Sequence, residues 1–510
     1  ILSFDTRINL KELQVQDAIG LFAGENLSLE LLTNGELDLD GGSIAGATSV
    51  KVTNGEILYD LYYLNLSDNN FTASARASYD YSNEKIGPAE VHLELKDVLS
   101  LSAAGSLNLK EPFPTRLSIQ LPSNPLPPLF KMFLMEPFGR DKPYLTDIKV
   151  DGHVSTDLEW TGTAGDWSIK GVCRWRDGRL SFKEGKVSAT GIDMDYPVWY
   201  QSGTLQRELN PLAGKLSIES LSLPYLSKQP LQSIIHAKPN QVSIATPTHI
   251  KLSKGSIMVG PVTVRDMFSL NASAETSLTV NKSDISLQVS TIWPSPIPAT
   301  IEGRLGQISI ERERIESQGE LVVEAFDGKA TLSGLGVARF LSTAPLVKLD
   351  AEFAELQLGR MTANTPIGRI DGILRGHIKN LEVAYGQPQH FDLLLETEKR
   401  KDIKQKISIQ AIDTIARVGG GQSPFVGFGA IFSSFFETFN YEKIGIRSTL
   451  KNDLIRINGT IVEDKKEYIM KGSALAGVNI INQNPNNRIR FKDMIKRIKR
   501  ITEGGKPVIR

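Results

Sequence analysis

The residue types that carry most enzyme chemistry are present in this sequence, but they do not fall into catalytic spacings. No serine lies in a G-x-S-x-G segment, the sharp turn that exposes the nucleophile of α/β-hydrolases. The glycine triplet 419–421 lacks the following Lys-Ser/Thr of a phosphate-binding loop, and segment 334–339 (GLGVAR) lacks the third glycine of a dinucleotide fingerprint. We therefore expect no catalytic residues and a protein that is not an enzyme.

Two pairs of carboxylates at strand spacing, Asp38/Asp40 and Asp193/Asp195, could hold a cation or serve a glycosidase. Residues two apart in a strand share a face, and we favour the simpler interpretation that these pairs decorate a solvated face. The histidines are too scattered for a zinc site, and the single cysteine, Cys173, excludes an internal disulfide. We expect Cys173 to be a core thiol, and we expect neither a metal nor a cofactor.

The charge balance hides an asymmetry. The 510 residues hold 58 Lys and Arg against 58 Asp and Glu, and zero net charge disfavours a nucleic-acid binder with a bulk basic surface. Residues 485–510 alone hold nine Lys and Arg against two Asp and Glu, so the rest of the chain is mildly acidic. No run of apolar residues is long enough to span a bilayer as a helix.

The strongest signal is an apolar–polar alternation with a period of two. In residues 148–160 (IKVDGHVSTDLEW) apolar side chains alternate with charged or polar ones, and 91–96, 167–176, 347–353 and 455–461 repeat the pattern. Successive side chains of a strand point to opposite faces, so each run predicts a strand with one apolar and one wet face. The predicted inward residues are Ile148, Val150, Val154, Leu158, Trp160, Trp167, Ile169, Trp175, Ile285, Leu287, Val289, Val347, Leu349, Phe353, Leu374, Ile378, Ile455, Ile457 and Ile461.

A chain of this length has room for roughly 30 to 35 strands, and an open twisted sheet of that size must curl, close or split. A solenoid needs a fixed repeat period, and strung sandwiches need linkers; neither is evident. We therefore predict an all-β fold: a long, highly twisted, mostly antiparallel sheet curled into an elongated groove with an apolar interior. Glycines on the apolar side would help it curl: Gly105, Gly152, Gly171, Gly372, Gly376 and Gly459. Tight hairpins are predicted at Asn34-Gly35, Asn54-Gly55, Asp177-Gly178 and Asp327-Gly328.

A few segments have helical spacing instead. Residues 126–137 suggest a short amphipathic helix or lid, and 425–440 a phenylalanine-rich helix that covers a groove end or contacts a membrane. Residues 488–501 form a basic amphipathic pattern that suits an anionic membrane, a cap on the groove end, or packing back onto the sheet. The predicted contact residues of the last two segments are Phe425, Phe428, Phe432, Phe435, Phe436, Phe491, Lys492, Lys496 and Lys499.

The C-terminal third resembles a known family. The run GRIDGILRGHIKNLEV (368–383) resembles the AsmA-like repeat, and 126–152 is similar to an earlier repeat of this kind. Segments 388–421 and 441–461, with the tail from Gly477, resemble the C-terminal part of bacterial YdbH-type proteins. On this basis the chain divides into an N-terminal part of a β-groove (1–125), central AsmA-like repeats (126–387), a YdbH-like β segment (388–484) and a basic tail (485–510).

The resemblance implies a β-groove that carries phospholipid across the periplasm between inner and outer membranes. It also implies an N-terminal helix anchored in the inner membrane and an outer-membrane or small periplasmic partner protein at one end, with no nucleic acid. Because the sequence starts at Ile1 without such a helix, we expect a truncated or processed chain. Two alternatives remain open: a TamB-like scaffold that lends its sheet edge to outer-membrane β-barrel proteins during their assembly, and a structural surface protein made of dry β-sandwiches.

Overall fold

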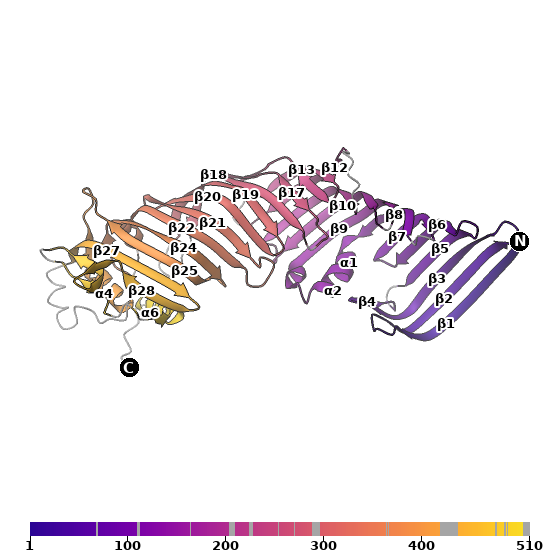
Figure 1. Cartoon of the computed structure of the whole chain (residues 1–510), viewed down its shortest axis with the longest axis horizontal. Coiled ribbons are helices and arrows are strands. Elements are labelled where there is room, and N and C mark those ends of the chain that lie inside the picture. The colour runs from indigo at the N-terminus through magenta and orange to yellow at the C-terminus, as the bar shows by residue number, and fades with distance from the viewer. Residues whose placement is uncertain are drawn as a thin grey trace. The chain divides into compact units, whose positions relative to one another are not determined.

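The computed structural model describes residues 1–67, 70–109, 113–163, 165–202, 210–223, 228–252, 254–269, 271–287, 296–363, 365, 367–418, 437–474, 477–483, 486 and 488–502. The chain is all-β: strands take up 70% of it and helices 8%, and every strand pairing described is antiparallel, as the alternation predicted. It divides into two compact units, drawn in Figure 1. Unit 1 comprises Ile1–Thr248, Gly260–Ala274 and Leu341–Thr343; unit 2 comprises His249–Val259, Glu275–Phe340 and Ala344–Arg510.

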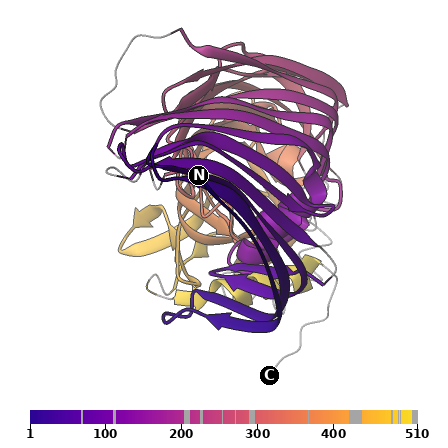
Figure 2. The same cartoon turned by 90° about the vertical axis from the view of Figure 1, so that its right-hand side faces the viewer.

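Unit 1 is an antiparallel meander in which neighbours in sequence pair from β1 to β3 and from β5 to β14; β3 pairs with β5, and β14 with β17. Its strands bend along their length (Figure 2). They are β1 (Leu2–Gln16), β2 (Phe22–Asp38), β3 (Ser43–Tyr59), β4 (Tyr62–Asn65), β5 (Phe71–Asp80), β6 (Lys85–Leu95), β7 (Leu99–Asn108), β8 (Phe113–Pro125), β9 (Ile148–Gly162), β10 (Trp167–Phe182), β11 (Val187–Gln201), β12 (Leu212–Ser222), β13 (Gln229–Lys238), β14 (Gln241–Ile244) and β17 (Val262–Arg265).

Unit 2 has the same kind of meander, in which β19 to β22, β24, β25, β27, β28 and β32 pair in that order. Its strands are β15 (Thr248–Lys251) and β18 (Ser273–Leu287), whose first residues belong to unit 1, with β16 (Ser256–Val259), β19 (Ile297–Glu311), β20 (Arg314–Ala325), β21 (Gly328–Ala338), β22 (Leu346–Gln357), β23 (Ile370–Asp371), β24 (Ile373–Ala384), β25 (Gln387–Glu398), β26 (Lys406–Ser408), β27 (Thr438–Lys451), β28 (Leu454–Gly459), β29 (Ile461–Glu463), β30 (Lys466–Gly472), β31 (Ile480–Ile481) and β32 (Arg488–Arg490).

Helices interrupt the meanders at a few places. The described part of unit 1 has one helical excursion, between β8 and β9, near the range predicted as a helix or lid: α1 (Leu126–Phe130), the π-helix η1 (Lys131–Met135), α2 (Glu136–Phe138) and the 3-10 helix η2 (Pro143–Asp147). Unit 2 contains α3 (Leu358–Thr362), α4 (Ile409–Val418) and α6 (Phe491–Thr502). The sequence analysis did not predict α3 or α4.

Three of the four predicted hairpins are wrong. Asn34-Gly35, Asn54-Gly55 and Asp177-Gly178 lie inside β2, β3 and β10, and only Asp327-Gly328 lies at a turn, between β20 and β21. These strands are 16 or 17 residues long, longer than the usual strand. At 54–55 and 177–178 the register shifts, so there the Asn-Gly and Asp-Gly pairs form bulges that bend a continuing strand.

The predicted helix ranges also need correction. Most of 425–440, including Phe425, Phe428, Phe432, Phe435 and Phe436, lies outside the described residues, but residues 438–440 begin strand β27, with Phe439 opposite Ile407. In the basic segment, Arg488–Arg490 are strand β32 and the helix starts only at Phe491. Both differences reflect pairing with a neighbouring strand, which overrides local helical spacing.

The glycines on the apolar side are needed where neighbouring strands approach closely. A Cβ added at Gly376 in β24 would collide with the backbone oxygen of Leu394 in the paired strand β25. By contrast, a Cβ at Gly306, beside a bulge in β19, would meet nothing within 4 Å. Gly376 therefore permits a close approach of β24 and β25 that any other residue would prevent unless a strand moved.

Replacing Gly376 by alanine tests this role. We expect Gly376→Ala to destabilise unit 2 by about 2 kcal/mol, seen as a thermal unfolding midpoint lowered by about 4–8 °C. Gly306→Ala is the matched control and should leave the midpoint within about 1–2 °C of the parent. Circular dichroism follows the unfolding of each variant. Equal midpoints for the two variants would show that the close approach at Gly376 is unimportant for stability.

Candidate functional site

The strand register places the apolar side chains of unit 1 on one face of its sheet. Leu158 in β9, for example, lies opposite Ile119 in β8 and Gly171 in β10. We call this surface the unit 1 apolar face. Two of its rows cross the sheet as Ile8, Leu31, Val50, Ala73, Leu93 and Leu101, and as Leu10, Leu29, Val52, Phe71, Leu95 and Leu99.

A strip of small side chains runs between the rows of large ones. The next two rows contain mainly Thr, Ala and Gly, and beyond them Leu2, Leu37, Ile44 and Tyr79 restore large side chains. The flanking rows are six residues apart in β1, from Leu2 to Ile8, or about 20 Å along the strand. The first small row is Thr6, Thr33, Thr48, Ala75, Val91 and Ala103. The second starts in β1 with a large residue, Phe4, and continues as Gly35, Gly46, Ala77, Ala89 and Gly105.

The predicted inward residues of β9 and β10 all lie on this face. The register pairs Trp160 with Ile169 and Val154 with Trp175, and the rings of Trp160 and Trp167 stack with centroids 4.6 Å apart. Cys173 lies on the same face, where its sulfur accepts a hydrogen bond from Thr156 at 3.3 Å. The half-buried residues among those predicted are Ile148, Val150, Val154, Leu158, Trp160, Trp167, Ile169 and Trp175.

Unit 2 has an apolar face built in the same way. One row crosses it as Leu332, Ala351, Ile378 and Leu393, and Phe353 lies in the row beside it. Val347 is exposed, Ile285 and Ile461 are half-buried, and the side chain of Leu287 and the whole of Val289 lie outside the described residues. The predicted inward residues that follow this register are Val347, Leu349, Phe353, Leu374, Ile378, Ile455 and Ile457.

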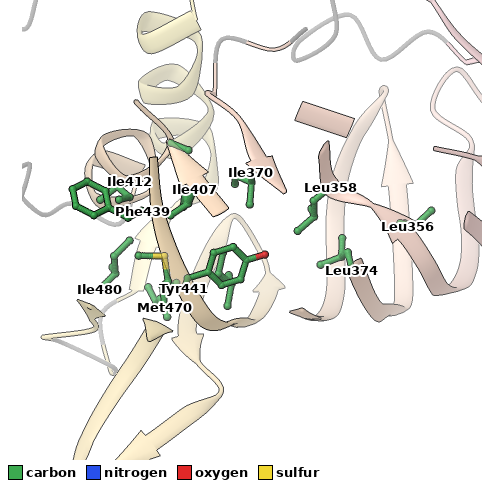
Figure 3. Packing of buried hydrophobic residues seen from close by; sticks show 13 residues of the cluster. Leu356, Leu358, Ile370, Leu374, Ile407, Ile412, Phe439, Tyr441, Met470 and Ile480 are labelled. Carbon is green, nitrogen blue, oxygen red and sulfur yellow. The ribbon is translucent and has the colours of Figure 1, made fainter. Parts of the chain in front are cut away.

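Toward the C-terminus this face is covered and becomes a dry core. Figure 3 shows Leu374 in a buried cluster with Ile407, Tyr441 and Met470, to which β26, β27, β30 and α4 contribute. The Tyr441 hydroxyl donates to the carbonyl of Asp371 at 2.8 Å, and burial raises the pKa of this phenol. Leu374 and the equally buried Ile455 are therefore core residues rather than open lining.

Elsewhere most side chains of the apolar faces stay partly accessible, although Val52 and Leu95 in unit 1 and Ala351 in unit 2 are buried. Apart from Leu374 and Ile455, no described residue predicted to line the groove is buried. The whole chain exposes 31349 Å², whereas two compact bodies of half its mass would together expose about 22,000 Å². Two sheets packed face to face would bury these side chains, so the pattern favours an apolar surface that the chain itself leaves partly uncovered.

The charged residues lie on the opposite face, where they pair across strands. Arg174 pairs with Asp157, Arg176 with Asp195, and Lys443 donates to Glu396 Oε1 at 2.8 Å. The Lys443 ammonium holds the pKa of the Glu396 carboxyl below its usual value. Exposed ion pairs add little stability each, but here they keep unpaired charge off the apolar face.

The polar face of unit 1 is also hollowed, which the sequence did not predict. A depression of about 620 Å³ is lined by polar, charged and small apolar residues of β2 to β8, with Ser49, Arg76, Glu90 and His92 among them. His92 Nδ1 lies 3.0 Å from Ser102 Oγ there, and the register sets Arg76 opposite Glu90. Covering these charged groups with an acyl chain would cost free energy of desolvation, so this depression suits water better.

The carboxylate pairs have structural partners. Asp38 Oδ1 accepts hydrogen bonds from the amides of Asp40 and Gly41, which closes the turn after β2. Asp195 faces Arg176 and Lys215, and its neighbour Asp193 lies opposite Ser217. Within the described part of the chain, no three His, Cys, Asp or Glu side chains gather as they would around a metal ion.

Helix α6 packs back onto the sheet through its apolar side. Phe491, Met494 and Ile495 cover Leu450 and Ile455, and the Phe391 and Phe491 rings meet edge to face at 6.3 Å. The Asp453 carbonyl and carboxylate accept from the first helical amides. Lys492 and Lys496 are exposed on the other side; the side chain of Lys499 is not among those described. The helix therefore packs on the sheet and presents a basic outer surface.

Sequence reasoning missed one contact on the unit 1 apolar face. The turn after β17 places Met267 and Phe268 over β11, where Phe268 lies 5.2 Å from the Tyr200 ring and its amide donates to the Tyr200 hydroxyl at 3.0 Å. The Tyr196 hydroxyl contacts the Met267 sulfur, and burial raises the pKa of Tyr196. The available signal was the apolar residues Met267, Phe268 and Leu270 in the sequence between β17 and β18.

Comparison with known proteins finds no match to a protein-family model, to a curated protein or to a solved structure. In the part of the chain described, no helix has both the length and the apolar character to cross a membrane. The functional argument therefore depends on the geometry of the two apolar faces and of α6.

An introduced charge tests whether the unit 1 apolar face binds aliphatic chains. We expect Leu158→Asp to weaken binding of a fluorescent long-chain fatty acid about tenfold, because a carboxylate would have to be desolvated beside the chain. Ser181→Asp places the same charge on the polar face opposite Lys149 and should leave the affinity unchanged. Equal affinities for both variants, measured by fluorescence titration, would exclude this face as the binding surface.

Charge reversal tests the outer surface of α6. We expect the variant with Lys492, Lys496 and Lys499 changed to Glu to bind anionic vesicles at least about a hundredfold more weakly, since each basic residue near a membrane contributes about 1 kcal/mol. The control reverses the exposed Lys51, Lys96 and Lys238, which gives the same net charge. If both variants float equally well with vesicles, α6 serves only in packing.

Proposed function

We propose that this protein is a non-enzymatic lipid carrier whose apolar faces conduct the acyl chains of phospholipids. The observation that supports this most is the accessible apolar surface that crosses many strands in each unit, with the paired charges on the opposite face. A soluble protein rarely leaves so large an apolar area without a ligand or partner.

The energetics explain why a lining of this kind is needed. Exposing an acyl chain to water costs about 0.8 kcal/mol per methylene, or about 12 kcal/mol for fifteen of them. A phospholipid therefore moves slowly between membranes unless an apolar surface surrounds its acyl chains along the whole path. The small-residue strip of unit 1 offers such a surface without charged groups that would select one lipid, and its Thr33 and Thr48 hydroxyls hydrogen bond to each other at 3.2 Å. We therefore expect low specificity for acyl chains, with the head groups left in water.

The resemblance to AsmA-like and YdbH-type proteins supplies the cellular setting of the proposal. On this basis we propose a protein of the periplasm that is tethered to the inner membrane by an N-terminal helix and reaches toward the outer membrane, with a partner protein at one end. The exposed lysines of α6 fit a contact with anionic phospholipid at the C-terminal end.

A second function is favoured by one observation. Among the described residues, β1 pairs only with β2, and its other edge offers backbone groups to a further strand, as a TamB-like assembly scaffold would require. This function needs the strand edge and not the apolar face. A charge on the apolar face would leave it intact, which separates the two proposals.

Lipid transfer between vesicles tests the proposed function. We expect the purified protein to carry phospholipid, detected by mass spectrometry, and to accelerate transfer of a fluorescent phospholipid from donor to acceptor vesicles. Leu349→Asp should lower the transfer rate about tenfold, because the charge lies on the route. The matched control is Gln318→Asp at an exposed position. Lipid-free preparations, or full transfer by Leu349→Asp, would contradict lipid conduction.

A further inference from the structure

Exposed apolar side chains gather at one end of the first strands of unit 1. The β1–β2 and β3–β4 turns meet there, with the Asp60 amide donating to the carbonyl of Leu21 at 2.7 Å, and the Tyr62 ring lies 6.2 Å from Phe133 of η1. We call this surface the tip patch. Its residues are Ile19, Leu21, Leu58, Tyr59, Leu61, Tyr63, Phe133 and Leu134, all of them exposed.

The two turns are held in place rather than frayed. The amide of Phe22 donates to Asp17 Oδ1 at 3.1 Å, and the amide of Asp17 donates to the Phe22 carbonyl at 3.0 Å. In the other turn, Asp60 has a φ of +53° and Tyr59 pairs with Tyr62 across a two-residue connection. Both turns therefore direct apolar side chains outward, and Ile19 and Leu61 are 77% and 52% exposed.

The exposed side chains occupy both faces of the β3–β4 hairpin. Ile57 and Leu64 point into the core of unit 1, while Leu58 and Tyr63, their neighbours in sequence, lie on the opposite face. Tyr59 lies at the tip, on the face of Ile57. A flat partner would cover one of these sets and leave the other in water, whereas a lipid medium would surround both.

The charges near the patch favour a neutral surface. Residues 17–22 and 58–64 contain no Lys or Arg, and their only acidic groups are Asp17, which closes its turn, and Asp60. Beside Phe133 and Leu134, Lys131 lies 3.7 Å from Glu136, and this pair adds no net charge. Tyrosine combines an apolar ring with a hydroxyl that stays hydrated, a combination enriched at the level of lipid head groups. We propose that the tip patch docks shallowly into the interfacial region of a phospholipid bilayer, without a requirement for anionic lipid.

This docking would hold a strand end of the unit 1 apolar face against the membrane. The tip patch adjoins Leu64 and Met132, which pack in the same cluster as Val52 and Leu95 of that face. The proposal does not depend on lipid conduction, because vesicle binding is measured without any transfer. It also differs from the α6 contact, which requires anionic lipid.

Flotation with vesicles of pure phosphatidylcholine at high salt tests the docking, since these conditions suppress binding through α6. The tip variant carries Ile19→Ser, Tyr59→Ser and Leu61→Ser. The control variant carries Leu39→Ser, Tyr385→Ser and Val462→Ser at positions at least as exposed as Tyr59. We expect the parent and the control to float, and we expect the tip variant to bind the vesicles at least about tenfold more weakly.

Two results would overturn the proposal: a parent protein that fails to float with neutral vesicles, or tip and control variants that float equally. Circular dichroism and thermal unfolding of both variants show whether the fold is retained. A second copy of the chain would be an alternative partner for the tip patch. Sedimentation of the parent without vesicles tests this by measuring whether the protein is a monomer or a dimer. A dimer that the tip variant dissociates would overturn bilayer docking in favour of self-association, whereas a monomeric parent supports it.

Discussion

The structure depends on one constraint: antiparallel strands must stay in register, so that apolar side chains of neighbouring strands meet on one face. Because side chains alternate with a period of two, a slip of one residue would move a whole apolar row to the wet face. The rows from Ile8 to Leu101 and from Leu332 to Leu393 keep this register across many strands. Bulges reset it where the strands bend, at Gly152 for example. Both the accessible apolar faces and the ladders of ion pairs behind them follow from this register.

Alternation was sufficient to predict the fold class and the face on which most inward residues lie. The face of Leu158, Trp160 and Ile378 could be assigned because each lies in a run with clear periodicity. Strand ends were less predictable, since Asn34-Gly35 has the chemistry of a hairpin turn yet lies within a strand paired on both sides. Coverage was not predictable either, because an open face and a dry core have the same periodicity. Leu374 shares its alternating run with the half-buried Ile378, and only tertiary packing buries it.

The distribution of covered and accessible surface connects the fold to the proposed function. At the C-terminal end, helices and short strands close the apolar face into a core that stabilises unit 2. Over most of unit 1 the same kind of face is covered only locally, by η1 at one strand end and by Met267 and Phe268 at the other. A protein that needed only stability would gain it by burying these rows. Leaving them accessible is explained if a mobile apolar ligand occupies them.

The most direct test of lipid conduction asks which face touches lipid. A photoreactive amino acid is placed at Leu93 on the unit 1 apolar face or at His92, its neighbour on the polar face, and the protein is irradiated in cells and analysed by mass spectrometry. We predict a phospholipid adduct at Leu93 and none at His92, because successive residues of β6 face opposite sides. Adducts of equal yield at both positions, or at neither, would contradict the proposal that the apolar face carries lipid.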